Sequence, residues 1–173
     1  MCAGAVILPD DFPKEILNDS KKLSAAAREK ARHLICSHSL AWGIGWVSPA
    51  EIDEINIHKA SLLAMKRAFE AMAAAPKDGV FSIDAVSAVA DGLFVPDISV
   101  PCRALVKADS LVQAVMAASI LAKTARDRLM EYYGIFFPGY GYEKHKGYPT
   151  KAHREAIGQL GPSSIQRMSF RCR

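Results

Sequence analysis

The feature that most constrains the fold is the order of the hydrophobic segments, in which short apolar runs alternate with longer segments of helical character. The runs short enough for strands are residues 3–8, 40–47, 80–86 and 103–108, and the helical segments are residues 25–38, 49–74, 110–133 and 151–160. Strands followed by helices indicate an α/β fold, with a mixed sheet flanked by helices. The 173 residues contain no repeat or long linker. They fit a single domain, residues 1–173, with a C-terminal helical part from about residue 134 to residue 173.

Two helix starts are marked by capping sequences. Ser48 is followed by Pro49 and, three residues after the serine, by Glu51. A capping serine, a proline in the first turn and a glutamate at this spacing predict a capping box. Ser110 and Gln113 have the same spacing. They predict a second capping box, at the start of the alanine-rich helix that follows.

Composition narrows the class of protein only moderately. The formal net charge of +4 and the pI of about 8.9 suit a polyanionic partner without requiring one. The four cysteines are scattered, with no C-x-x-C pair, which favours reduced thiols over a disulfide framework or a zinc site. No apolar stretch approaches the ~20 residues of a membrane span, and no basic run precedes the first apolar residues. We therefore expect a soluble, cytoplasmic protein without a membrane partner.

Two aspartates stand where an acid has a chemical use. Asp84 lies within the apolar run 80–86, where an acid is disfavoured both as a strand former and as a buried charge. Asp109 ends the next predicted strand. Carboxylates at the ends of successive core strands suit Mg²⁺ or Mn²⁺ and phosphoryl chemistry. The alternatives are a strand-end aspartate bonded to a nearby loop for Asp84, and a helix-start acid for Asp109.

A polar turn before the first helix carries Ser20, Lys21 and Lys22. Backbone amides, a hydroxyl and ammonium groups gathered before a helix can hold a phosphate. A run of this kind is also typical of an ordinary solvated turn. The turn is therefore a candidate phosphate-binding segment that needs support from the rest of the chain.

Three further residues are candidates for contacts to nucleic acid. Ser119 and Lys123 are four residues apart and share one face of a helix. Tyr148 is an aromatic residue on a glycine-containing basic loop, where it can stack on a sugar or a base. The alternatives are a serine that is small enough to pack, a lysine that faces water and a tyrosine that fixes its own loop.

The motifs that contain these residues resemble the bacterial ribonuclease HII (type 2 ribonuclease H) family. The resemblance runs in order from about residue 3 to residue 170. Its segments are residues 18–24 (NDSKKLS), 41–45 (AWGIG), 49–57 (PAEIDEINI), 107–110 (KADS), 117–123 (AASILAK), 126–127 (RD), 145–150 (HKGYPT) and 167–170 (RMSF).

The resemblance implies an RNase H-like fold and an endonuclease that depends on Mn²⁺ or Mg²⁺. Such enzymes cut the RNA strand of RNA–DNA hybrids, and duplex DNA that contains ribonucleotides, on the 5′ side of a ribonucleotide. They leave a 5′-phosphate and a 3′-hydroxyl. Asp84 and Asp109 match the third and fourth catalytic metal-ligand acids of the family. Ser20 and Lys21 match its phosphate-contacting motif, and Tyr148 matches the tyrosine under the junction sugar. The predicted nucleic-acid contacts are Ser20, Lys21, Lys22, Ser119, Lys123 and Tyr148.

Two departures from the family pattern bear on activity. The glycine that follows the third acid is Ala85 here. The D-E-x-G-R-G segment, which carries the first two acids and the first, central strand, does not occur before residue 3. We expect a full-length form to be a monomeric nuclease of DNA replication and repair. The alternatives are a catalytically inactive relative that binds hybrids, and a gene fragment that lacks two of the four acids.

Overall fold

The computed structural model describes residues 1–18, 20–75 and 82–170, apart from the side chain of Asp84. The helices predicted at 25–38, 49–74 and 151–160 and the strands predicted at 3–8 and 40–47 are confirmed to within one residue at each end. The elements in chain order, with η for a 3-10 helix, are β1 (Cys2–Ile7), η1 (Lys14–Ile16), α1 (Ala25–His38), β2 (Ala41–Trp46), α2 (Pro49–Ala73), η2 (Ile83–Ala85), β3 (Ala88–Asp91), β4 (Cys102–Leu105), η3 (Ala108–Ser110), α3 (Gln113–Phe136), α4 (Tyr142–His145) and α5 (Lys151–Leu160).

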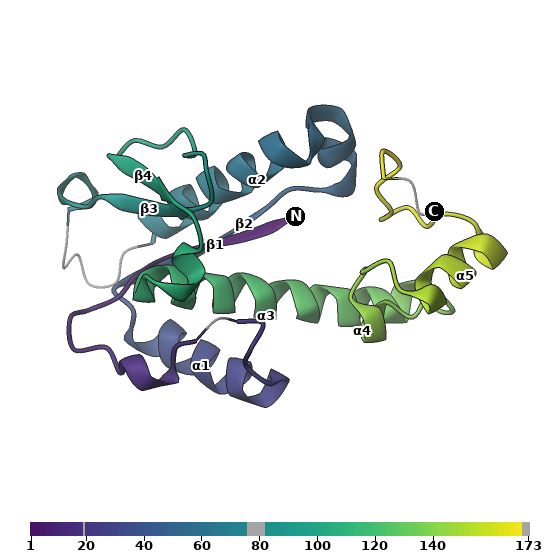
Figure 1. The fold of residues 1–173 in the computed structure, drawn as a ribbon, viewed down its shortest axis with the longest axis horizontal. Helices are drawn as coiled ribbons and strands as arrows, with labels where there is room; N and C mark the ends of the chain where they lie inside the picture. Colours follow the sequence, from purple (N-terminus) through teal and green to yellow (C-terminus); the bar gives the residue numbers. More distant parts are fainter. Residues whose placement is uncertain (19, 76–81, 171–173) are drawn as a thin grey trace.

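The centre of the fold is an antiparallel pair of strands between helices. β1 pairs with β2 from Cys2 opposite Trp46 to Ile7 opposite Ala41. Helix α2 lies on one side of this pair and α3 on the other, with α1 next to α3, and the short helices α4 and α5 lie at the far end of α3 (Figure 1). The long helix α3 therefore links the sheet to the C-terminal part of the chain.

Close contact between sheet and helices depends on glycines in the two strands. A Cβ atom added to Gly43 or Gly45 of β2 would overlap the backbone of α2. A Cβ atom added to Gly4 of β1 would overlap the backbone of α3 at Ala118. Since neither backbone can move without disturbing its own hydrogen bonds, these glycines set the distance between the layers.

The core lies on both sides of this sheet. On the α3 side, a cluster of buried residues is centred on the fully buried Ile35 and Ile120. Each of these side chains stabilises the fold by about 1.5–3 kcal/mol relative to exposure. On the α2 side, Phe69 and Met72 pack with Ala41 of β2. The α3-side cluster consists of Phe12, Ala31, Ile35, Ala117, Ile120 and Leu121.

A second, separate sheet differs from the sequence prediction. The strand predicted at 80–86 is wrong for its described part, because Ile83–Ala85 forms the 3-10 helix η2, and residues 80–81 lie outside the described residues. The strand is β3, which begins at Ala88 and pairs in parallel with β4. The strand predicted at 103–108 ends at Leu105. Among the described residues no ladder joins β1 to β3, so one antiparallel pair and one parallel pair replace the predicted mixed sheet.

One of the two predicted capping boxes forms. At the start of α2, Glu51 N–H donates to the Ser48 hydroxyl, and Ser48 N–H donates to the Glu51 carboxylate. The box predicted at Ser110 and Gln113 is wrong, because Ser110 belongs to η3 and α3 begins after Val112 without a side-chain cap. Helix α3 is therefore held at its start by packing rather than by a local cap.

Within the described ranges, no helix combines the length and apolar character that crossing a membrane requires.

Candidate nucleic-acid and metal site

The polar turn before α1 is fixed by an arginine from that helix. Arg28 Nη1 donates to the carbonyl oxygens of Ser20 and Leu23, at 3.1 and 2.6 Å. Ser20 is buried, and its hydroxyl oxygen lies 2.8 Å from the hydroxyl oxygen of Ser119 on α3. The turn therefore touches α3, and the structure brings Ser20 and Ser119 together although 99 positions separate them.

Lys21 extends from this turn to the acid at the start of η3. Its Nζ lies 3.5 Å from Asp109 Oδ2. The Asp109 side chain is only 12% exposed, whereas that of Lys21 is 76% exposed. A largely buried carboxylate thus faces an exposed ammonium group, so Lys21 is the member of this ion pair that a ligand at the protein surface can reach. Lys22 is exposed beside Lys21 in the same turn.

A second carboxylate at this place was not among the predicted site residues. Asp91 is the last residue of β3, and β3 runs parallel to β4, the strand that leads to Asp109. Asp91 Oδ1 accepts a hydrogen bond from Ala108 N–H at 2.9 Å. This bond joins the end of β3 to the residue before Asp109, near the carboxyl ends of the two parallel strands, where α/β folds place their ligand sites.

A signal for Asp91 was present in the sequence. The resemblance requires a strand-end acid followed by glycine, and Asp91 is followed by Gly92, whereas Asp84 is followed by Ala85. Gly92 has φ +131°, a backbone conformation that other residues rarely adopt. Its backbone N–H also donates to Leu105 O at 3.1 Å, which closes the end of the ladder. The chain therefore needs a glycine at this position.

Asp84 does not lie where the sequence analysis placed it. Its backbone belongs to η2, before β3, and its side chain lies outside what the structure describes. The argument that an acid within a strand must have a chemical use therefore does not apply to Asp84. Its role as a metal ligand stays a prediction, and Asp91 is the competing candidate on geometric grounds.

The carboxylates suit a hard divalent cation. Mg²⁺ and Mn²⁺ take oxygen ligands from carboxylates and water. Asp91 at the end of β3 and Asp109 in η3 would supply such oxygens to one ion whose other ligands would be waters. Among the residues that the structure describes, no three His, Cys, Asp or Glu side chains form a group that could hold a metal ion. A two-ion site requires additional carboxylates.

One face of α3 carries the remaining polar candidates. Lys123 Nζ lies 2.8 Å from Asp127 Oδ1, and Arg28 Nη2 lies 3.5 Å from the other oxygen of the same carboxylate. Lys123 Nζ and Arg126 Cζ lie 5.5 and 5.1 Å from the centre of the Tyr148 ring. Both are within range for attraction between a cation and an aromatic face. Tyr148 therefore joins the α3 cations, and 54% of it remains exposed.

The loop that carries Tyr148 is tightly held. Two consecutive residues before it, Lys146 and Gly147, have positive φ angles of 51° and 76°. Tyr148 N–H donates to the His145 carbonyl at 2.9 Å, and the Tyr148 carbonyl accepts from His153 Nδ1 at 3.0 Å. Burial, the main cause, lowers the pKa of His153, which favours the neutral ring. Sequence reasoning did not identify either histidine as part of the site.

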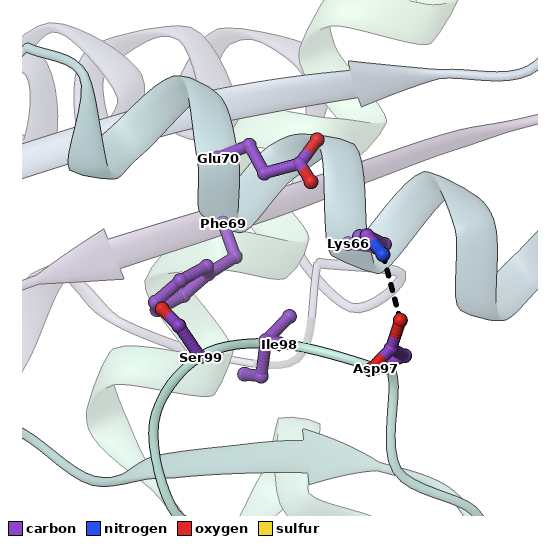
Figure 2. Close-up of a pocket in the computed structure, with 6 residues that line it drawn as sticks. All are labelled: Lys66, Phe69, Glu70, Asp97, Ile98 and Ser99. Carbon is purple, nitrogen blue, oxygen red and sulfur yellow. Dashed lines mark hydrogen bonds and ion pairs between the residues drawn. The ribbon is translucent and has the colours of Figure 1, made fainter.

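A shallow pocket on the other side of the sheet lies apart from these residues (Figure 2). Phe69 of α2 and Ile98 of the β3–β4 connection face each other in it, and Lys66 forms an ion pair with Asp97 at 2.7 Å. The aspartate is 93% exposed. None of the predicted site residues lines this pocket. Its contacts attach the β3–β4 connection to α2.

Buried thiols do not add a nucleophile to the site. Burial raises the pKa of Cys2 to about 12, so this thiol is protonated at neutral pH. Cys172 lies outside the described residues. Cys2 is therefore not a candidate nucleophile of this site.

This α/β domain has one acid at the end of β3 and a second in η3, where the lysine-bearing turn reaches it. Together with the exposed aromatic ring next to the cations of α3, these are the groups of a nuclease. The family model for ribonuclease HII matches residues 1–172. The chain therefore belongs to the ribonuclease HII family, whose members are ribonuclease H hydrolases, and the predicted family resemblance is confirmed.

Relatives of known name agree with this assignment. The ribonuclease HII of Treponema denticola is 51% identical, over 97% of this chain and 88% of the relative. That of Nitrosococcus oceani is 47% identical, over 98% of this chain and 80% of the relative. The chain thus spans most of the length of these proteins.

Solved structures confirm the predicted RNase H-like fold class. The ribonuclease H2 from Pyrococcus horikoshii OT3 has a TM-score of 0.64 at 20% identity, covering 99% of this chain and 95% of that one. The chain in the PCNA:RNase HII complex from Archaeoglobus fulgidus has a TM-score of 0.66 at 23% identity, covering 96% of this chain and 83% of that one. The small sheets and long helices described above are therefore a variant of a known architecture.

Proposed function

We propose that this chain is a divalent-metal-dependent endonuclease that cuts the RNA strand of RNA–DNA hybrids and ribonucleotides embedded in duplex DNA. Cleavage is on the 5′ side of the ribonucleotide and leaves a 5′-phosphate. The observation that carries the proposal is the convergence of Lys21 with Asp109, at 3.5 Å, beside the Ser20–Ser119 contact on α3. Anion-binding and metal-binding groups thus adjoin each other on one surface.

The residues divide into two functions. Asp91 and Asp109 would hold the Mg²⁺ or Mn²⁺ ion, which would activate a water and supply positive charge next to the scissile phosphate. Lys21 and Lys22 provide ammonium groups for backbone phosphates, and these contacts position the duplex without reading its sequence. The contact between Ser20 and Ser119 holds the turn against α3, whose Lys123 provides a further ammonium group next to Tyr148.

Tyr148 supplies the contact that distinguishes sugars. Its ring rests on Lys123 and Arg126, and more than half of the residue is exposed. Stacking of an aromatic ring on a nucleotide contributes about 1–3 kcal/mol, without sequence preference. We place this ring under the sugar at the junction between RNA and DNA.

The metal assignment is tested with three matched substitutions, Asp91→Asn, Asp109→Asn and Asp84→Asn, each of which removes one charge. They are made in the chain extended by whatever the native transcript encodes upstream of the Met1 codon. A duplex with a single ribonucleotide is incubated with Mg²⁺ or Mn²⁺, and its products are separated by electrophoresis. Asp91→Asn and Asp109→Asn abolish cleavage, whereas Asp84→Asn retains it. The reverse pattern for residues 84 and 91 would restore Asp84 as the ligand.

A second candidate function is hybrid binding without cleavage. It is favoured by one observation, that the described residues contain no cluster of three metal-binding side chains. In a binding module, affinity for a hybrid is the same in EDTA and in Mg²⁺, and no product forms in either. In the nuclease, Mg²⁺ gives product and the lysine contacts alone give binding in EDTA. Product formation with Mg²⁺ therefore decides between the two functions.

The remaining proposals concern the setting of the reaction. We infer that the protein acts as a monomer in the cytoplasm, in DNA replication and repair, where ribonucleotides in DNA arise. Sedimentation of the chain with and without a hybrid duplex tests the monomer, since a second copy would double the bound mass.

A further inference from the structure

We propose that His153 and His145 are positioning residues for Tyr148, holding the turn that carries it through a stacked pair of imidazole rings. This inference rests on the proposed contact between Tyr148 and the nucleotide, and it extends that contact to residues that do not touch the ligand. The two rings are stacked, with their centres 4.2 Å apart and an angle of 17° between their planes.

His153 fixes the carbonyl side of Tyr148. A carbonyl oxygen only accepts, so the 3.0 Å contact between His153 Nδ1 and Tyr148 O requires a proton on Nδ1. The other ring nitrogen, Nε2, is buried and has no hydrogen-bond partner. A proton there would be a buried donor without an acceptor, which is costly. His153 is therefore a neutral ring with one defined tautomer, and its single donor is directed at Tyr148.

His145 fixes the other side of the same turn. Its Nε2 donates to Tyr140 O at 2.7 Å, and its Nδ1 accepts from Gly147 N–H at 3.1 Å. Both ring nitrogens of His145 therefore have a hydrogen-bond partner within the loop. The His145 carbonyl also accepts from Tyr148 N–H. The backbone on each side of Tyr148 is thus bonded to one member of the histidine pair.

The turn has a third support from α3. Arg126 Nη2 donates to Lys146 O at 2.7 Å while its guanidinium lies under the Tyr148 ring. Backbone and ring are therefore fixed relative to the same helix that carries Ser119 and Lys123. A rotation of the turn would move the ring away from these cations, so the histidine contacts determine where the ring meets a sugar.

The test compares two substitutions of His153 that separate its donor from its ring. His153→Phe keeps an aromatic ring but removes the Nδ1 donor, and His153→Asn keeps an amide donor near the Nδ1 position. Binding in EDTA is measured by fluorescence anisotropy, with a labelled duplex containing one ribonucleotide and an all-DNA duplex of the same sequence. Amide hydrogen exchange of Lys146, Gly147, Tyr148 and Thr150 is measured in parallel, and circular dichroism checks that each variant is folded.

We expect Tyr148→Ala to weaken binding of the ribonucleotide duplex about tenfold. His153→Phe causes a similar loss, and the double variant Tyr148→Ala/His153→Phe loses no more than Tyr148→Ala alone, because the histidine acts through the tyrosine. His153→Asn restores most of the affinity. In His153→Phe, exchange at Tyr148 and Thr150 accelerates while exchange in α1 is unchanged.

Additive losses in the double variant would overturn the inference and leave the role of Tyr148 intact. If Tyr148→Ala binds normally, the proposed contact of Tyr148 is wrong, and the exchange measurement alone decides whether the histidines hold the turn. Unchanged exchange in a folded His153→Phe would overturn the positioning role. If His153→Phe does not fold, His145→Leu replaces it, since that change removes the acceptor for Gly147 N–H.

Discussion

Asp91 accepts a hydrogen bond from the backbone N–H of Ala108, with 2.9 Å between Oδ1 and N. The bond connects the end of β3 to the residue just before Asp109. The positions of the two carboxylates are therefore linked, because Asp91 fixes the backbone next to Asp109. If Asp91 is both a hydrogen-bond acceptor for the backbone and a metal ligand, different substitutions should affect stability and metal binding separately.

Two substitutions at Asp91 distinguish these functions. Asp91→Asn keeps an oxygen that accepts from Ala108 N–H, so the free energy of unfolding changes little while binding of Mn²⁺ is lost. Asp91→Ala removes the acceptor as well and lowers the free energy of unfolding by about 1.5 kcal/mol. Urea unfolding measures stability, and titration calorimetry measures Mn²⁺ binding. Equal Mn²⁺ affinity in Asp91→Asn and the parent chain would exclude Asp91 as a ligand.

The contact between Ser20 and Ser119 predicts strong coupling. Ser119→Ala leaves the buried Ser20 hydroxyl without its 2.8 Å partner, which costs about 1–2 kcal/mol. Ser20→Ala has a comparable cost. Replacing both serines removes the unsatisfied group, so the double variant is less destabilised than the sum of the single ones. Urea unfolding of all four proteins gives the coupling energy, and a value near zero would show that the hydroxyls do not bond.

The sequence predicted those elements whose signals are local. Ser48 and Glu51 have the spacing of a capping box, a motif that depends only on neighbouring residues, and this prediction is confirmed. The prediction of a strand at residues 80–86 was wrong for its described part, because an apolar run with one acid resembles a strand when it is considered without its partner. What selects Ala88–Asp91 instead is its pairing with Cys102–Leu105, and no local pattern encodes a partner across a loop.

In the candidate site, too, some residues could be predicted from sequence motifs and others could not. The family motifs were sufficient to group Lys21 with Asp109, although these two residues are far apart in the sequence. The sequence pattern did not single out Asp91, because an acid inside an apolar run is a stronger local signal than an acid at the end of a strand followed by glycine. His153 was missed because its contribution is a hydrogen bond to a backbone carbonyl, which leaves no chemical signature in the sequence.

Gly92 is expected to tolerate no side chain, for a reason that does not involve space. A Cβ atom added there meets nothing within 4 Å, but the φ of +131° is unfavourable for any other residue. Gly92→Ala should therefore lower the free energy of unfolding by about 1–3 kcal/mol. Gly158 of α5 is the matched control, because it also has open space and lies in a helix. Gly158→Ala should raise stability by up to about 1 kcal/mol, and thermal melts of both variants test the contrast.

Lys21 is expected to contribute electrostatically to hybrid binding. Lys21→Ala weakens binding of hybrid and all-DNA duplex alike, and the slope of log K against log salt becomes less steep by about 1, because one phosphate contact is lost. Lys30→Ala, on an exposed position of α1, is the control and keeps the original slope. Anisotropy titrations at several salt concentrations measure the slope. An unchanged slope in Lys21→Ala would remove this lysine from the interface.

The buried state of His153 predicts how stability depends on pH. Burial lowers the pKa of His153 below its ordinary value of 6.5, and the titratable groups packed against its ring are Tyr142 and His145. Above pH 6.5 the ring is neutral in both folded and unfolded chains. As the pH falls below about 6.5, the unfolded chain takes up a proton that the folded chain does not, so the free energy of unfolding decreases until the folded pKa is passed.

Urea unfolding between about pH 7 and pH 5 should show a smaller decrease in the free energy of unfolding for His153→Phe than for the parent chain, because the variant lacks this titration. Parallel curves for the two proteins would mean that His153 protonates equally in both states.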